Sequence, residues 1–279
     1  DLEIPHWKKD KWWMYDRFNR HINYLRISVT DRCNLRCVYC MPPEGIQLMR
    51  HEDILSFDEI VEVTRKAVSM GIDKVRITGG EPLVRKGIVE LVGMIAQIKG
   101  IRDFGMTTNG TLLHRFAKPL ADAGLHRVNI SLDTLDADKY RRITRRGNIE
   151  NALRGIEAAR DAGLQPIKLN CVVKKNSSEP DARQVKLFAQ KHGYQVRFIR
   201  EMDLETGDFG IVEGGDGGNC GKCNRLRLTS DGKIKPCLFS DLGYDVRELG
   251  AEQAIRLAVE NKPKSGTHSF VNKFSNIGG

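Results

Sequence analysis

The sequence predicts an α/β fold: a partial (β/α)6 barrel of the TIM type, followed by a smaller C-terminal region. Between Tyr24 and Ile199, a short β-branched run followed by a helical pattern recurs six times. This alternation predicts parallel strands joined by crossover helices. Six units are too few to close an eight-stranded barrel, and a doubly wound sheet is the alternative. In both architectures we expect ligands at the carboxyl ends of the strands.

The predicted strands share short apolar runs; in order they are YLRISV from Tyr24, KVRIT from Lys74, DFGMTT from Asp103, RVNISL from Arg127, PIKLNCVV from Pro166 and QVRFI from Gln195. The predicted helices share apolar residues at helical spacing; they are FDEIVEVTRKAVSM after the cap Ser56, KGIVELVGMIAQI, LLHRFAKPLADAG, NIENALRGIEAARDAG and DARQVKLFAQKHG. Several of them end at glycines that are typical C-caps, which are Gly71, Gly124, Gly163 and Gly193.

We divide the chain into an N-terminal extension (1–20), the barrel (21–203) and a C-terminal region (204–279). The stretch DLETGDFGIVEGGDGGN is rich in glycine and acidic residues and indicates a loop. After it, LRLTSDGKIKPCLF predicts a hairpin around Asp231-Gly232, and RELGAEQAIRLAVEN predicts a helix.

The composition favours an anionic partner. Lys and Arg number 45 against 36 Asp and Glu, which gives a net charge of +9. A nucleotide, a nucleic acid or an acidic surface would suit this charge, and so would a basic surface without a partner. We expect no nucleic acid, because no RNA-binding or helix-turn-helix pattern is present. We also expect a cytoplasmic protein without membrane contact, because no apolar run approaches the roughly 20 residues of a membrane span and the first residues lack a signal-peptide core.

Six of the seven cysteines form two tight triplets, and Cys171 stands apart in an apolar run as a predicted core residue. The odd count argues against a disulfide framework, and clustered reduced thiols indicate metal ligands. The first triplet, CNLRCVYC, directly follows the first strand. Cys33, Cys37 and Cys40 can hold three irons of a [4Fe–4S] cluster and leave the fourth open. Zinc bound by these thiols and a distant histidine is the alternative.

The second triplet has the spacing C-x2-C-x13-C at Cys220, Cys223 and Cys237. A zinc ribbon would need a fourth ligand, and His268 is the only histidine nearby in the sequence. We favour a second [4Fe–4S] cluster with an open iron, so residues 204–279 are predicted to be an auxiliary cluster region.

The first triplet, with Tyr39 before its last cysteine, resembles the signature of the radical S-adenosylmethionine (SAM) superfamily. TGGEP from Thr78 resembles that family's motif for the methionine amino group of SAM. The resemblance implies catalytic cluster ligands at Cys33, Cys37 and Cys40. It also implies SAM contacts, which are Tyr39, Gly79, Gly80, Glu81, Thr107, Thr108, Asn109, Ser131 and Met202. Polar residues at strand ends can instead satisfy backbone groups, and Met202 can be a core residue.

From about Tyr15 to Gly279 the chain resembles the MoaA-like family, the GTP 3′,8-cyclases of molybdenum cofactor biosynthesis. CGKCNRLRLTSDGKIKPCLF is the most diagnostic part of this resemblance. The resemblance implies GTP-binding residues, which are Arg26, Lys74, Arg76, Lys168, Arg197, Arg225 and Arg227. Strand alternation places Lys74, Arg76 and Thr78 on one side of their strand, where cations need an anion. Any one of these cations could also be a solvated surface residue.

The resemblance implies a radical SAM lyase with two [4Fe–4S] clusters. The first cluster would cleave SAM with one electron, and the resulting radical would take the 3′ hydrogen of GTP so that the ribose carbon attacks C8. The second cluster would hold the guanine, and Gly278-Gly279 would thread into the site. A one-electron reductant and a downstream molybdopterin-pathway enzyme are the implied partners.

The chain departs from this family before the second triplet. Its linking stretch is several tens of residues shorter than usual, and Asn219 replaces an aromatic residue. A related enzyme acting on another nucleotide or on a peptide is therefore the alternative. A non-catalytic iron–sulfur or zinc module with a nucleic-acid-binding face would leave the GGEP motif unexplained.

Overall fold

The computed structural model describes residues 14–278. Most of the predicted N-terminal extension, including the first residues, which lack a signal-peptide core, lies outside the described residues, as does Gly279. Within the described part, the strands form a single sheet in the order β6-β5-β4-β3-β2-β1-β7-β8-β9. The strands are β1 (Tyr24–Ser28), β2 (Lys74–Thr78), β3 (Asp103–Thr108), β4 (Arg127–Ser131), β5 (Lys168–Val173), β6 (Gln195–Arg200), β7 (Arg225–Leu228), β8 (Lys233–Lys235) and β9 (Tyr244–Asp245).

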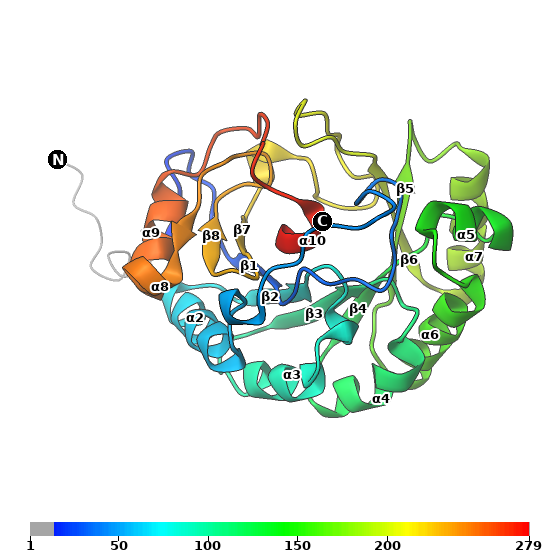
Figure 1. Ribbon diagram of the computed structural model, residues 1–279, viewed down its shortest axis with the longest axis horizontal. Helices are drawn as coiled ribbons and strands as arrows, with labels where there is room; N and C mark the ends of the chain where they lie inside the picture. The colour runs from blue at the N-terminus through cyan, green and yellow to red at the C-terminus, as the bar shows by residue number, and fades with distance from the viewer. Residues whose placement is uncertain (1–13, 279) are drawn as a thin grey trace.

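The first six strands are parallel and follow one another in chain order. This order confirms the partial barrel and excludes the doubly wound sheet, in which the strand order reverses. Figure 1 shows the strands around a central space that holds α10, with the other helices along the outside of the arc. The helices are α2 (Phe57–Met70), α3 (Ile88–Ala96), α4 (Leu113–Asp122), α5 (Ala137–Thr144), α6 (Ile149–Asp161), α7 (Pro180–His192), α8 (Val246–Leu249), α9 (Ala251–Glu260) and α10 (Phe274–Ile277).

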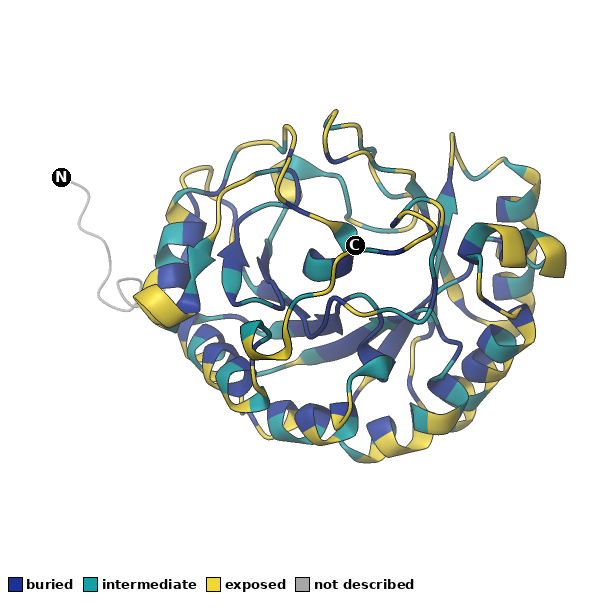
Figure 2. Ribbon diagram, viewed as in Figure 1, coloured by how far each residue is buried: buried dark blue, intermediate teal, exposed yellow. Residues whose placement is uncertain are grey.

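The helices form where the sequence predicts them, with local signals at their ends. The Ser56 hydroxyl accepts the amide of Glu59, and the Glu59 carboxylate accepts the amide of Ser56, which is a capping box for α2. Gly71 ends this helix at φ +122°. Most of the outer helices turn an apolar side toward the sheet, as the buried inner faces in Figure 2 show, so the core lies between the sheet and the helical arc.

The four-residue helix α10 was not expected, and neither was the longer α5. Only Tyr140 and Thr144 are buried in its eight residues, so no apolar stripe marks it in the sequence. It forms because the Asp136 side chain caps its start by accepting the amide of Lys139 at 2.8 Å.

The C-terminal region extends the same sheet. Strand β7 pairs parallel to β1, and β7 and β8 form the predicted antiparallel hairpin. The strand β1 therefore lies between β2 and β7, with the barrel on one side and the hairpin on the other. No helix among residues 14–278 is long and apolar enough to span a bilayer.

Candidate active site

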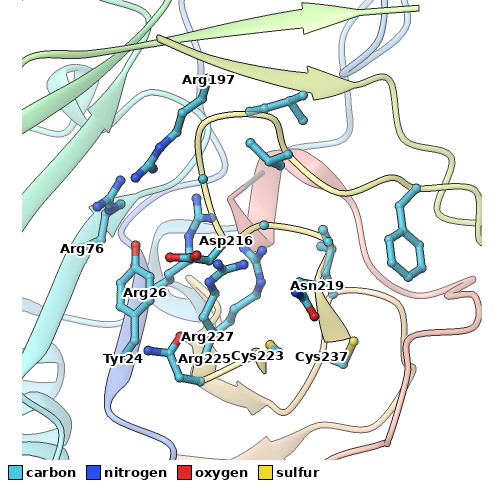
Figure 3. Close-up of a pocket in the computed structure, with 18 of the residues that line it drawn as sticks. Tyr24, Arg26, Arg76, Arg197, Asp216, Asn219, Cys223, Arg225, Arg227 and Cys237 are labelled. Carbon is cyan, nitrogen blue, oxygen red and sulfur yellow. The ribbon is translucent and has the colours of Figure 1, made fainter. Parts of the chain in front are cut away.

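A cavity of about 340 Å³ lies inside the partial barrel, and nine basic side chains contribute to its lining. This volume is within the range of small-molecule sites. All seven predicted GTP-binding residues line it; they are Arg26, Lys74, Arg76, Lys168, Arg197, Arg225 and Arg227. The strands place them there because residues two apart on a strand face the same side. Figure 3 shows several of these guanidinium groups converging on one space.

The basic residues lie at the starts and middles of their strands, which differs from the expectation of a site at the carboxyl ends. Lys74 and Lys168 are the first residues of β2 and β5. The first cysteine triplet and the GGEP motif, after β1 and β2, and the predicted SAM contacts at the ends of β3 and β4 do lie at strand ends. The candidate site is therefore extended along the barrel interior, with the basic cavity toward the amino ends of the strands.

Neighbouring strands bring like charges into direct register. Arg26 of β1 is opposite Arg76 of β2 on one side and Arg227 of β7 on the other. Arg76 and Arg227 are only 4% and 8% exposed. Burial, followed by the charge of Arg225, lowers the pKa of Arg227 to about 10. Cations crowded in this way are destabilising unless an anion pairs with them, so the cavity is built to hold an anion.

Two further observations are compatible with an anion that comes from outside the chain. The buried Nε atoms of Arg76 and Arg197 have no hydrogen-bond partner among the described residues. The ring of Tyr24 lies among the cations, with Arg76 Cζ at 5.6 Å from its centroid. Burial alone would raise the pKa of the Tyr24 hydroxyl, but Arg76, Arg26 and Arg225 outweigh burial and lower it.

The second triplet shares this cavity, since Cys220, Cys223 and Cys237 all line it. The short turn η4 (Cys220–Lys222) and the β7–β8 hairpin bring the three thiols together. Burial would raise the pKa of Cys223, but the Lys262 ammonium, a backbone amide and Arg225 outweigh it and lower the pKa. A buried cation beside a thiol favours the thiolate, which is the form that binds a metal.

The support for this triplet comes from residues distant in the sequence. Arg20 pairs with Asp16 and donates to the Cys220 carbonyl at 2.6 Å. Lys262, 2% exposed, donates to the Arg225 carbonyl at 2.7 Å and to the Pro236 carbonyl. Arg20, which precedes the second triplet in the sequence, and Lys262, which follows it, thus both fix the backbone next to its cysteines.

The first triplet lies on the cysteine loop, which we define as residues 31–41. The amide of Leu35 donates to Cys33 Sγ at 3.4 Å, and Asn109 Nδ2 lies 4.0 Å from the same sulfur. Burial, then Asp133 and Cys33, raises the pKa of the Cys37 thiol to about 12. Such a thiol ionises only when a metal centre binds it.

The thiols fit clusters better than single ions. Among residues 14–278 no three His, Cys, Asp or Glu side chains come close enough to hold one metal ion. A mononuclear zinc site needs all its thiolates about 2.3 Å from one ion. An iron–sulfur cluster separates its ligands by its own width, so the wider spacing of the thiols in both triplets is compatible with such clusters.

The GGEP loop is bonded to the cysteine loop through its backbone. The amide of Gly80 donates to the Thr30 carbonyl and that of Glu81 to the Arg32 carbonyl, each at 2.8 Å. A Cβ on Gly80 would lie 2.3 Å from the Arg32 carbonyl oxygen, so only glycine allows this approach. Gly79, at φ +148°, makes the same turn.

The predicted SAM contacts at the strand ends gather beside this loop. The Glu81 carboxylate accepts the Thr108 hydroxyl and the Asn109 amide, each at 2.7 Å, and burial raises its pKa to about 7. The Tyr39 hydroxyl donates to Asp133 at 2.6 Å. Ser131 ends β4 and is partly buried.

Two of the predicted SAM contacts lie away from the GGEP loop. Thr107 and Met202 line the basic cavity. Met202 also packs against a small apolar cluster that contains Phe239 and Ile277. It therefore joins the cavity wall to the C-terminal segment.

The C-terminal tail reaches into the barrel, as expected for Gly278; Gly279 lies outside the described residues. Arg227 donates to the carbonyl of Gly278. Gly278 has φ +71°, and a Cβ there would lie 2.3 Å from Thr78 Cγ2. Figure 1 shows α10, directly before Gly278, in the central space of the barrel.

Sequence reasoning missed three contributors to the cavity. Arg127 forms a two-pronged ion pair with Asp103, with both bonds at 2.7 Å. Its place at the start of β4 matches that of Lys74 on β2, which is the signal that could have found it. Asp216, on the glycine-rich loop, and Lys262 also line the cavity, and no local pattern marks either of them.

Comparisons with known proteins agree with this geometry. The model of the radical SAM superfamily matches residues 27–189, and that of Molybdenum Cofactor Synthesis C matches residues 166–267. The GTP 3′,8-cyclase of Thermodesulfovibrio yellowstonii is 45% identical over 282 positions, covering 85% of this chain and 88% of its own length. That of Geobacter sulfurreducens is 41% identical, covering 90% and 93%. The chain belongs to the GTP 3′,8-cyclase family of radical SAM enzymes.

Members of the radical SAM superfamily use SAM and a [4Fe–4S] cluster, and GTP 3′,8-cyclases carry a second cluster. Solved structures agree on the fold. Streptococcus suis SuiB bound to SAM is 16% identical with a TM-score of 0.60, covering 86% of this chain and 64% of that one. A native anSMEcpe structure with AdoMet and a Kp18Cys peptide is 18% identical with a TM-score of 0.57, covering 86% and 81%.

Proposed function

We propose that this chain is a GTP 3′,8-cyclase that converts GTP into 3′,8-cyclo-7,8-dihydro-GTP in molybdenum cofactor biosynthesis. One observation supports this most strongly: the seven predicted cations and the three thiols of the second triplet line the same cavity. A nucleoside triphosphate has these two requirements, because its phosphates need cations and its base needs an anchor. A peptide substrate would not need so many cations.

The proposed roles follow from position. The arginines among the seven cations bind phosphate oxygens through paired N–H groups, and the two lysines add charge. Cys220, Cys223 and Cys237 would hold the second cluster, beside the base. Cys33, Cys37 and Cys40 would hold the first cluster, whose chemistry with bound SAM is a one-electron cleavage that supplies the hydrogen-abstracting radical. Glu81, Asn109 and Ser131 would orient SAM.

The protein contributes mainly position and the exclusion of water. The glycine-rich loop lines the cavity and the C-terminal tail contacts Arg227 in its wall, so both would help to shield the ribose once the nucleotide is bound. We propose the functional division 21–203 for SAM chemistry and 204–279 for the auxiliary cluster, preceded by an extension (1–20).

The reaction needs a one-electron reductant, and its product needs a downstream enzyme of the molybdopterin pathway. We place the protein in the cytoplasm, where GTP is available and where six cluster thiols would stay reduced.

Anaerobic reconstitution tests the proposal. The protein should hold about eight irons, as two [4Fe–4S] clusters imply. With SAM and dithionite, GTP should drive 5′-deoxyadenosine formation, while ATP and UTP should not. The triple variant Cys33→Ala, Cys37→Ala, Cys40→Ala should form none. Deoxyadenosine formed equally with and without GTP would overturn the assignment of GTP as substrate, and formation by the triple variant would overturn the assignment of the first cluster.

A further inference from the structure

An arginine-rich segment at the end of α5 takes no part in the site described above. Residues 141–146 read RRITRR, with arginines at Arg141, Arg142, Arg145 and Arg146. Arg141, Arg142 and Arg146 are exposed, and none of the three forms an ion pair within residues 14–278. The acidic residues of α5 lie at its other end, and Asp136 there caps the helix.

This segment is fixed directly to the cysteine loop. The amides of Arg36 and Val38 donate to the carbonyls of Thr144 and Ile143, at 3.0 and 2.9 Å. Arg145 donates in turn to the carbonyls of Arg36 and Met41, at 2.9 and 2.8 Å. Arg145 has φ +60°, a left-handed conformation that is costly for a residue with a Cβ. The contacts of its side chain with the cysteine loop compensate for this cost, so the arginines keep a fixed place beside the cluster ligands.

The cysteine loop reaches the protein surface at this place. Cys40 is exposed, unlike Cys33 and Cys37, and the Val38 side chain is 52% exposed. Val38 is thus an apolar contact point, and the exposed arginines beside it form a cationic rim. Both lie next to Cys40, which is the most exposed of the three predicted ligands of the first cluster. Interfaces commonly have this arrangement of an apolar centre and a polar rim.

We propose that Val38, Cys40, Arg141, Arg142 and Arg146 form the docking surface for a small acidic electron-carrier protein. This inference rests on the proposed function, which requires one electron at the first cluster for each turnover. The reduced carrier loses one electron and the oxidised cluster gains it, with no other bond made or broken in this step. Three exposed arginines attract an acidic partner and orient it on the loop that holds the cluster.

The test separates docking from chemistry by changing the reductant. The triple variant Arg141→Glu, Arg142→Glu, Arg146→Glu is assayed for GTP-dependent deoxyadenosine with dithionite, and separately with a flavodoxin reduced by its NADPH-dependent reductase. Turnover with dithionite should stay within about twofold of wild type, because a small reductant needs no docking surface. Turnover with flavodoxin should fall about tenfold or more, mainly through a higher KM for flavodoxin. Added salt should slow the wild type with flavodoxin and leave the variant unchanged.

The matched control reverses three exposed charges far from the cysteine loop, in Arg65→Glu, Lys99→Glu, Lys191→Glu. It should behave as wild type with both reductants. Equal flavodoxin-driven turnover in the α5 variant and in wild type would overturn the docking surface. A second outcome would also overturn it. If the wild type binds RNA, the triple glutamate variant does not, and flavodoxin-driven turnover is the same in both, the surface is assigned to nucleic acid.

If the triple glutamate variant fails to load iron, two further measurements decide the question. These are the turnover of the variant Arg141→Gln, Arg142→Gln, Arg146→Gln and the direct binding of flavodoxin to immobilised holoenzyme. Unchanged flavodoxin affinity would then reject the surface. A wild type that forms no GTP-dependent deoxyadenosine with dithionite would instead contradict the proposed function.

Discussion

Arg26 and Arg76 lie directly opposite each other on the neighbouring parallel strands β1 and β2, with both side chains directed into the same cavity. Like charges directly opposite in a sheet destabilise it by about 0.2–1 kcal/mol. The arrangement therefore lowers the stability of the ligand-free protein and favours the binding of a polyanion.

Replacing Arg76 tests this relationship. Arg76→Met should raise the unfolding free energy of the nucleotide-free protein by up to about 1 kcal/mol. GTP binding should weaken about 10- to 100-fold, because a hydrogen bond to a charged group contributes about 1.5–3 kcal/mol. Denaturant unfolding and anaerobic calorimetry measure the two effects. Arg65→Met on the exposed face of α2 should change neither, and a less stable Arg76→Met protein would contradict the charge argument.

Lys168 should give nucleotide binding an alkaline limit. Burial, then Arg197, lowers its pKa to about 8. The charged form is thus present below about pH 8 and is lost above it, so GTP affinity should fall as pH rises from 8 to 10. Arg does not deprotonate in this range, so Lys168→Arg should flatten the profile. The same decline in the variant would show that another group causes it.

Asp216 should compete with the nucleotide for the cations. Its neighbours Gly215 and Gly217 lie against the guanidinium groups of Arg197 and Arg225, where added Cβ atoms would be 3.1 and 4.0 Å from the nearest guanidinium nitrogens. Figure 3 shows the Asp216 carboxylate among the arginines. Asp216→Asn should tighten GTP binding up to about fivefold, since accessible ion pairs contribute about 0.2–1 kcal/mol. Glu205→Gln, exposed on the same loop, is the control, and weaker binding by Asp216→Asn would instead assign the carboxylate to substrate recognition.

The tail position of Gly278 should be intolerant of a side chain. Gly278→Ala brings a methyl group into Thr78 and requires an unfavourable φ, so the tail must move. GTP-dependent deoxyadenosine formation should fall about 10- to 100-fold, as small displacements in an active site can cost this much. Gly250→Ala has a similar φ of +75° and no atom within 4 Å of its new Cβ, so it isolates the backbone effect. Equal activity of the two variants would show that the tail position is not required.

The barrel strands could be predicted because they follow from short-range periodicity, whereas the set of cavity cations was predicted from the resemblance to the cyclase family. The alternation in KVRIT places Lys74 and Arg76 on one face, and Ser56 with Glu59 marks the start of α2. The cysteine spacing likewise identified both triplets.

Features that depend on distant parts of the chain could not be predicted. The pairing of β1 with β7 joins residues about 200 positions apart, and only this pairing puts Arg26 opposite Arg227. The position of Asp216 depends on turns at glycines whose backbone freedom leaves many conformations open. Helix α5 has too few buried residues to show a period, so the arginine segment at its end had no predicted structural context.

The central position of β1 has a consequence for synthesis on the ribosome. One edge of this strand finds its partner β2 soon after translation, but the other edge waits for β7, which is made much later. During that interval the nascent chain carries an unpaired strand edge next to a run of buried apolar side chains, which is a state prone to aggregation. Production of intact protein should therefore depend on chaperone capacity, and chains truncated before Arg225 should accumulate in inclusion bodies.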